Sequence, residues 1–113
     1  MSSIAALAAR QLTAYNASDL EGFVDCYHDD VRVLDGEVES LRGKADFRER
    51  YRALFESWTF GATVPQRMDH EDQCFDLEDW WRIDPNTGER SEGRVIVRYA
   101  LRDERIGTVQ FFR

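Results

Sequence analysis

The chain has 113 residues, which is enough for one domain with one hydrophobic core, and 22 acidic against 15 basic residues give a net charge of −7. This charge repels a phosphate backbone and no basic run offsets it, so we expect no nucleic-acid partner. No apolar run approaches the ~20 residues of a membrane span, and the N-terminus lacks the basic region of a signal peptide. We therefore expect a single cytoplasmic domain over residues 1–113 with no membrane partner.

The residues that most often hold metals do not form a recognised site. Cys26 and Cys74 are isolated thiols, which we expect to be reduced and buried. His28 and His70 each stand beside acidic residues, but neither group has the spacing of metal ligands. The sequence therefore predicts no metal and no cofactor.

Three helices are predicted in the first half of the chain. The first spans about residues 3–17, and Gln11 stands within its apolar stripe. The second begins with a Ser-x-x-Glu capping box at residues 18–21 and ends near His28. The third spans about residues 43–58 and carries an apolar stripe made of Phe47, Tyr51, Leu54, Phe55 and Trp58.

A short strand separates the second helix from the third. The acidic pair at positions 29–30 predicts a turn, and residues 31–35 then alternate so that two valines and Asp35 share one face. Because the valines identify the buried face, we expect Asp35 to point inward at the end of the strand. A loop is expected over residues 36–42.

The rest of the chain is predicted to be β-structure, with strands near residues 61–71, 74–83, 92–102 and 105–113. Short turns join them, so successive strands are antiparallel. Helices followed by strands indicate an α+β fold in which the helices cover one face of the sheet. Apolar residues remain on the other face, which suggests an interface with a second copy of the chain.

Two carboxylates, Asp76 and Glu78, share one face of the strand over residues 74–83. If that face lines a cavity, they form an acid/base pair. If it faces outward, they pair with arginines on the neighbouring strand, namely Arg94, Arg98 and Arg102. The pattern favours the outward interpretation.

Short motifs along nearly the whole chain carry a family resemblance. They are Tyr15–Leu20, His28–Val31 leading to Asp35, Leu41–Gly43, Phe75–Glu78, Val97–Tyr99 and Ile106–Phe111. The sequence resembles the nuclear transport factor 2-like superfamily, in particular its SnoaL-like and ketosteroid isomerase-like members. The resemblance implies a cone-shaped fold, with three N-terminal helices packed on a strongly curved, mostly antiparallel sheet. It also implies an apolar cavity above the concave face and a homodimer through the outer face.

The resemblance further places Asp35 at the position of the isomerases' general base, which moves a proton beside a ketone. Asp35 also suits the start of a turn with Gly36. The tyrosine that serves the isomerases as oxyanion donor on the first helix is replaced by Gln11, and their strand aspartic acid falls near Val97. Asp35 is thus the candidate base and Gln11 its candidate polar partner, and the favoured alternative for Gln11 is a core amide whose hydrogen bonds are satisfied within the protein. The expected pocket wall comprises Tyr15, Tyr51, Phe55, Trp58 and Val97.

These motifs are specific for the fold and weak for the activity, because similar proteins include isomerases, cyclases, dehydratases and proteins that only bind or dimerise. The departures at Gln11 and Val97 argue against a working steroid isomerase. We expect a pocket for a small apolar molecule, with metal-free isomerase- or lyase-like acid/base chemistry as one hypothesis. The alternative is a non-catalytic ligand-binding protein or a dimeric interaction module.

Overall fold

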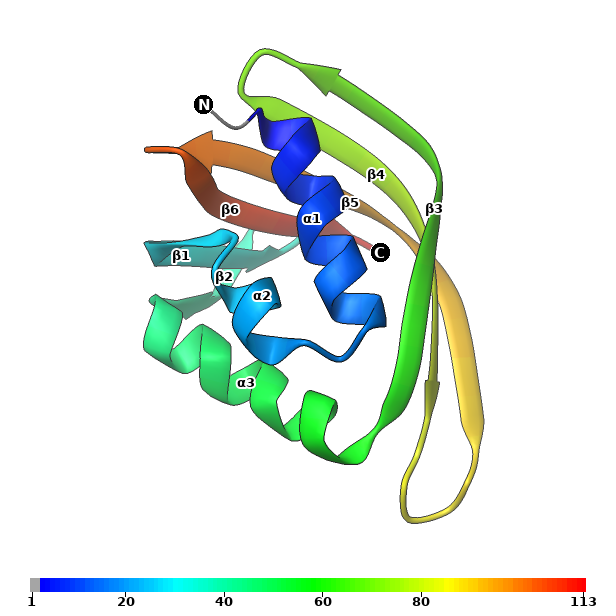
Figure 1. Ribbon diagram of the computed structural model, residues 1–113. Coiled ribbons are helices and arrows are strands. Elements are labelled where there is room, and N and C mark those ends of the chain that lie inside the picture. Colours follow the sequence, from blue (N-terminus) through cyan, green and yellow to red (C-terminus); the bar gives the residue numbers. More distant parts are fainter. Residues whose placement is uncertain (1–2) are drawn as a thin grey trace.

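The computed structural model describes residues 3–113 and shows three helices packed in the hollow of one sheet (Figure 1). The first half of the chain forms α1 (Ile4–Asn16), α2 (Leu20–Val24), β1 (Tyr27–Asp35), β2 (Val38–Arg42) and α3 (Lys44–Ser57). The second half forms β3 (Thr59–His70), β4 (Gln73–Ile83), β5 (Arg90–Arg102) and β6 (Arg105–Phe112). The predicted α+β class is confirmed.

The six strands form one sheet in the order β2-β1-β6-β5-β4-β3. The last strand, β6, pairs parallel with β1, and the other neighbouring strands are antiparallel. Register shifts in β1, β3 and β5 accompany a strong bend that wraps the long strands around α1 (Figure 1). The predicted curved, mostly antiparallel sheet under three helices is therefore confirmed.

Helix α1 is fixed at both ends by polar contacts that its sequence encodes. Ser3 caps its N-terminus, where the hydroxyl accepts a hydrogen bond from the Ala6 amide at 3.1 Å. At the other end, the Asn16 amide group donates to the carbonyl of Ala62 at 2.9 Å and accepts from its N–H at 2.8 Å. Asn16 therefore attaches the end of α1 to β3, and the helix lies across the concave face.

The start of α2 differs from the predicted capping box. Asp19 is the N-cap and accepts from the Gly22 N–H at 3.0 Å, while Ser18 adopts a φ of 55° in the connecting turn. Glu21 forms an ion pair with Arg48 of α3 instead of turning back to the cap. The helix ends at Val24, so Tyr27 belongs to β1.

The turn predicted at residues 29–30 and the loop predicted over 36–42 are both wrong. Asp30 lies within β1 and accepts two hydrogen bonds from Arg42 of β2, at 3.0 and 2.9 Å. Arg32 and Glu39 likewise pair across the same two strands at 2.6 Å. Cross-strand ion pairs, and not alternating apolar side chains, connect β2 to β1. The sequence of β2 therefore lacks the alternation that predicts a strand.

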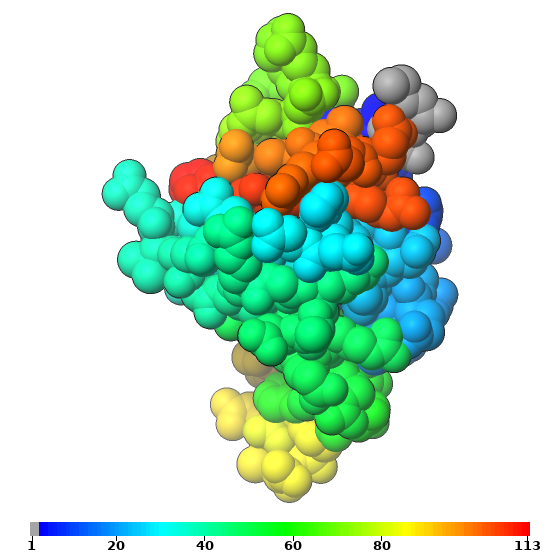
Figure 2. Space-filling view, turned by 90° about the vertical axis from the view of Figure 1, so that its left-hand side faces the viewer, coloured from blue at the N-terminus to red at the C-terminus, as the bar shows by residue number. Residues whose placement is uncertain are grey.

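The core is built around aromatic rings contributed by all three helices and β1. Phe23 is almost fully buried and contacts the rings of Tyr15, Tyr27, Phe47, Tyr51 and Phe55. Cys26 and Cys74 are buried free thiols, as predicted. The β3–β4 and β4–β5 hairpins extend beyond this core at opposite ends of the molecule (Figure 2).

Candidate functional site

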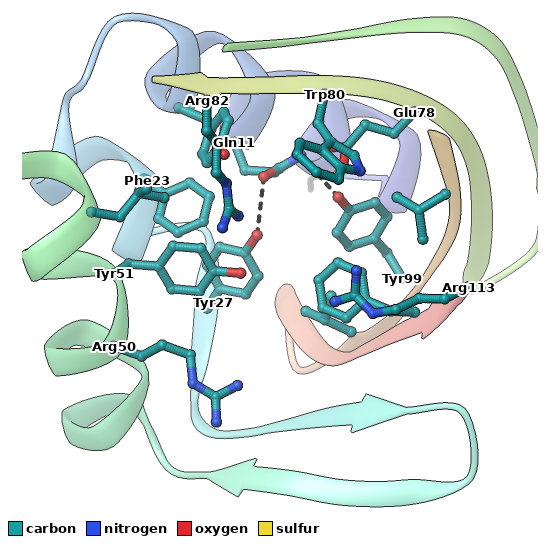
Figure 3. A pocket seen from close by; sticks show the side chains of 15 residues that line it. Gln11, Phe23, Tyr27, Arg50, Tyr51, Glu78, Trp80, Arg82, Tyr99 and Arg113 are labelled. Carbon is teal, nitrogen blue, oxygen red and sulfur yellow. Dashed lines mark hydrogen bonds between the residues drawn. The ribbon is translucent and has the colours of Figure 1, made fainter. Parts of the chain in front are cut away.

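A pocket of about 350 Å³ lies between the three helices and the concave face of the sheet (Figure 3). Its walls are mainly aromatic, but several polar and charged groups face into it. The lining residues are Gln11, Tyr15, Phe23, Tyr27, Arg50, Tyr51, Leu54, Glu78, Trp80, Arg82, Val95, Tyr99, Val109, Phe111 and Arg113.

A hydrogen-bonded chain of three side chains forms part of the pocket wall. The Tyr27 hydroxyl donates to the Gln11 carbonyl oxygen at 3.1 Å, and the Gln11 amide donates to the Tyr99 hydroxyl oxygen at 3.1 Å (Figure 3). The same Gln11 nitrogen donates to the backbone carbonyl of Ala8 at 3.0 Å, which fixes the orientation of the amide. Both hydrogens of the Gln11 amide are therefore used within the protein.

Tyr99 keeps a hydrogen that the protein does not use. Its oxygen accepts from Gln11, and within residues 3–113 no acceptor for its own hydrogen lies at hydrogen-bond distance. Burial, with the nearby charge of Glu78, raises the pKa of Tyr99 well above its ordinary value, so the phenol stays protonated at neutral pH. The donor function expected of Gln11 is thus available at Tyr99 instead.

Glu78 places a carboxyl group in the same pocket. Burial and the charge of Asp76 raise its pKa to about 7, while Arg82 and Arg113 oppose the rise. A carboxyl group with this pKa exists in both protonation states near neutral pH, which is what a general acid or base requires. Glu78 reaches this position because β4 directs its even-numbered side chains toward the helices.

The outward interpretation of Asp76 and Glu78 is therefore wrong. Asp76 is 1% exposed and accepts two hydrogen bonds from Arg67 of β3, at 2.7 and 2.9 Å. The arginines expected to bind these carboxylates have other partners: Arg94 binds Asp79, Arg98 binds Gln73 and Gln110, and Arg102 binds Asp30.

Trp80 covers part of the pocket because its neighbour on β5 is a glycine. A Cβ atom at Gly93 would lie 2.7 Å from the Trp80 ring, closer than any side chain tolerates. The ring therefore lies against Gly93 and forms part of the pocket lining. Arg82 stands over the same ring at 5.6 Å from its centre.

Asp35 does not point into the pocket, contrary to the prediction. It shares the face of Val33, but its side chain is 57% exposed and accepts from Arg113 at 3.1 Å. Val33 is covered by the helices, whereas Asp35 ends the strand at the rim, where Phe111 and Arg113 fill the adjacent wall. Its role as a base stays a prediction, and it does not line the pocket.

The other predicted site residues divide between the wall and the core behind it. Gln11, Tyr15 and Tyr51 line the pocket. Phe55 and Trp58 are partly buried against the core, and Val97 is fully buried, so none of these three belongs to the lining. Tyr27 and Tyr99 were not predicted as site residues, and Glu78 was one only in the interpretation that was not favoured, in which its strand face lines a cavity.

Within residues 3–113, no group of three or more His, Cys, Asp or Glu side chains is arranged to hold a metal ion. None of the described helices has the length and apolar character needed to cross a membrane.

Comparison with solved structures shows the same fold in several proteins. A Δ5-3-ketosteroid isomerase from Mycobacterium sp. aligns over 100% of this chain and 94% of its own, with a TM-score of 0.88 and 18% identity. A proposed polyketide cyclase from Pseudomonas putida aligns over 100% and 92%, with a TM-score of 0.86 and 14% identity. A Mycobacterium tuberculosis protein in complex with estradiol-17β-hemisuccinate aligns over 100% and 95%, with a TM-score of 0.88 and 15% identity.

No curated protein sequence gives a significant match. The family model of the SnoaL-like domain matches residues 8–108, which is nearly the whole chain. This match and the shared architecture agree with the resemblance carried by the sequence motifs. The chain belongs to the SnoaL-like domain family, within the nuclear transport factor 2-like superfamily.

Proposed function

We propose that this protein binds a small, mainly apolar molecule that carries a carbonyl oxygen, and that Glu78 and Tyr99 act on it as base and hydrogen-bond donor. One observation carries the proposal: a carboxyl group with a pKa of about 7 and a phenol with a free hydrogen line the same largely aromatic pocket. Aromatic walls bind the apolar body, and a few polar groups then orient it.

The reaction class that fits is proton transfer beside a carbonyl group. Tyr99 donates its hydrogen bond to the carbonyl oxygen, and ionised Glu78 removes a proton from the adjacent carbon. The C–H electron pair forms the enolate, whose oxygen Tyr99 stabilises. Protonated Glu78 then returns the proton to the same or a conjugated carbon, which completes an exchange or an isomerisation.

Gln11 acts in this scheme as a positioning residue. Its carbonyl oxygen accepts from Tyr27 and its amide donates to Tyr99, so the Tyr99 ring is held with its remaining hydrogen available. In the isomerases the tyrosine donor lies on the first helix, where this chain has Gln11. In this scheme the hydrogen-bond donor is instead Tyr99 on β5. Two of the similar structures support a mainly apolar ligand, because one is a ketosteroid isomerase and the other holds a steroid ester.

The experiment that tests the proposal follows deuterium exchange of the α-protons of 2-tetralone, an apolar bicyclic ketone, by NMR. We expect the protein to accelerate exchange above the buffer rate. Glu78→Gln should lower the protein-dependent rate by about 10²-fold or more, the usual contribution of a general base. Asp35→Asn should leave it within about twofold. Exchange that Glu78→Gln leaves unchanged would remove the catalytic part of the proposal.

Binding is tested separately by chemical-shift mapping with the same ketone. The shifts should centre on the pocket lining and disappear in Leu54→Trp, because the larger side chain fills the cavity. Val38→Trp is the matched control, since Val38 is 70% exposed on β2. Binding without accelerated exchange would support the alternative, a non-catalytic ligand-binding protein.

We also propose a homodimer through the outer face of the sheet. Leu77, Ile96 and Phe112 form one continuous row across β4, β5 and β6, and Phe75 and Met68 extend it toward β3. Ile96, Phe112 and Met68 are exposed large apolar side chains. Light scattering should give about twice the 13.2 kDa mass of the chain. A monomer mass at micromolar concentration contradicts the dimer.

A further inference from the structure

The mouth of the pocket is basic, although the chain as a whole carries a net charge of −7. Three lining arginines surround it from three separate elements: Arg50 from α3, Arg82 from β4 and Arg113 after β6. Figure 3 shows the side chains of Arg82 and Arg113 directed toward the cavity, whereas Arg50 extends along its edge toward Ser40 of β2. A positive mouth on a negative protein concentrates anions at one place on the surface.

Two of these arginines are unusual in having no acidic partner. In the part of the chain that the structure describes, eleven of the 15 basic side chains form an ion pair with an acidic side chain. Within residues 3–113, neither Arg50 nor Arg82 has a carboxylate at ion-pair distance. Arg50 donates to the hydroxyl and the carbonyl of Ser40, at 3.3 and 3.1 Å, which leaves its charge uncompensated.

Among the described residues Arg82 forms no ion pair, although its positive charge lowers the pKa of Glu78 in the same pocket. It stands over the Trp80 ring at 5.6 Å, and its charge opposes the rise that burial causes in the pKa of Tyr15. The third arginine, Arg113, is paired with Asp35, but both partners are more than half exposed. Such an exposed pair contributes little free energy, so a ligand carboxylate can displace Asp35 from Arg113 at little cost.

We propose that the occupant of the pocket is an amphipathic carboxylate, whose apolar body fills the cavity and whose carboxylate binds the arginines at the mouth. The guanidinium group presents paired N–H donors that match the two oxygens of a carboxylate. This inference rests on the proposed function, because it assigns the substrate class of the same pocket. Combined with the Tyr99 donor, it describes a molecule with a carbonyl oxygen in the pocket and a carboxylate at the mouth.

The test compares ligands that differ only in charge. The probes are 1-naphthaleneacetic acid with 1-naphthaleneacetamide, and 4-biphenylacetic acid with its amide, titrated by calorimetry at pH 8. We expect each acid to bind about tenfold more tightly than its amide, which is about 1.4 kcal/mol. Added salt should weaken the acids and leave the amides unchanged, because it screens exposed charges.

Variants assign the preference to the mouth. Arg82→Gln should remove most of the difference between acid and amide, and Arg82→Lys should retain part of it. Arg94→Gln is the matched control, because Arg94 pairs with Asp79 outside the pocket lining and its loss should change neither affinity. A preference for the acid that survives Arg82→Gln would overturn the assignment to the arginines.

The outcomes separate this inference from the proposed function. Equal affinity for acid and amide, with binding abolished by Leu54→Trp, overturns the anionic ligand and leaves the pocket function standing. Absence of binding by all four probes and by 2-tetralone, in a protein whose spectrum shows that it is folded, contradicts both.

Discussion

Two arginine–aspartate pairs lie on the concave face of the sheet, and they differ mainly in their exposure to water. Arg67 and Asp76 approach to 2.7 Å, with the Asp76 side chain only 1% exposed. Arg113 and Asp35 approach to 3.1 Å, with the Asp35 side chain 57% exposed. The first pair is packed into the core and the second lies at the pocket mouth. The same type of ion pair is thus buried at one place and exposed to water at the other.

This difference accounts for the properties of the pocket between the two pairs. Along β4, the residues that face the helices run from buried Asp76 through Glu78 and Trp80 to exposed Arg82. Burial and then the charge of Asp76 raise the pKa of Glu78, while the charges of Arg82 and Arg113 lower it. A carboxyl group with a pKa of about 7 therefore results from its position at the boundary between the dry and the wet region.

The largest effect is expected from Arg67→Met. Removing this partner leaves Asp76 buried without a countercharge, so we expect the free energy of unfolding to fall by about 3–5 kcal/mol. Urea denaturation at pH 7 measures the change. The double variant Arg67→Met with Asp76→Leu should recover most of the loss, because the charge to be buried is gone. A loss below about 1 kcal/mol in the single variant would mean that water reaches the Asp76 carboxylate.

A pH-dependent effect is expected from Glu78→Gln. The carboxyl pKa is about 7 in the folded protein against an ordinary value of 4.5. Between these values the folded state holds a proton that the unfolded chain has lost, so this group lowers stability as pH rises from 4.5 to about 7. The glutamine variant lacks this penalty, and its unfolding free energy relative to wild type should rise by at most about 3 kcal/mol.

Urea denaturation of both proteins at several pH values between 4.5 and 8 measures this difference. Glu37→Gln is the matched control, because Glu37 is exposed between β1 and β2 and its substitution should give a difference that does not change with pH. A Glu78→Gln difference that is equally constant would show that Glu78 is solvated like Glu37.

The sequence predicted those parts of the fold that depend on neighbouring residues along the chain. Apolar periodicity identified α1, α3 and the long strands, since a helix or strand that buries one face repeats its pattern locally. It missed β2, whose residues are tied to β1 by ion pairs such as Arg32–Glu39. It also placed the cap of α2 one residue early, because Ser18 and Asp19 both suit an N-cap.

The candidate site was harder to predict because its residues meet only through the tertiary structure. Alternation placed Asp35 on the correct strand face, but alternation does not show where the covering helices end. Asp76 was predicted to face solvent because the sequence did not reveal its partner. That partner, Arg67, lies on β3, where a register shift between Thr63 and Gln66 cannot be predicted from local alternation. The family resemblance predicted a pocket above the concave face of the sheet. It placed the base at Asp35, the position used by the isomerases.

The smallest effect is expected from Asp35→Asn, and it separates the two candidate bases. An exposed ion pair contributes little, so we expect the free energy of unfolding to change by less than about 1 kcal/mol. The 2-tetralone exchange rate should also stay near that of the wild type, because Asp35 lies outside the pocket lining. If Asp35→Asn instead abolished exchange while Glu78→Gln did not, the base would be Asp35. The rim would then have to close over the ligand, bringing the carboxylate of the wet region into the dry one.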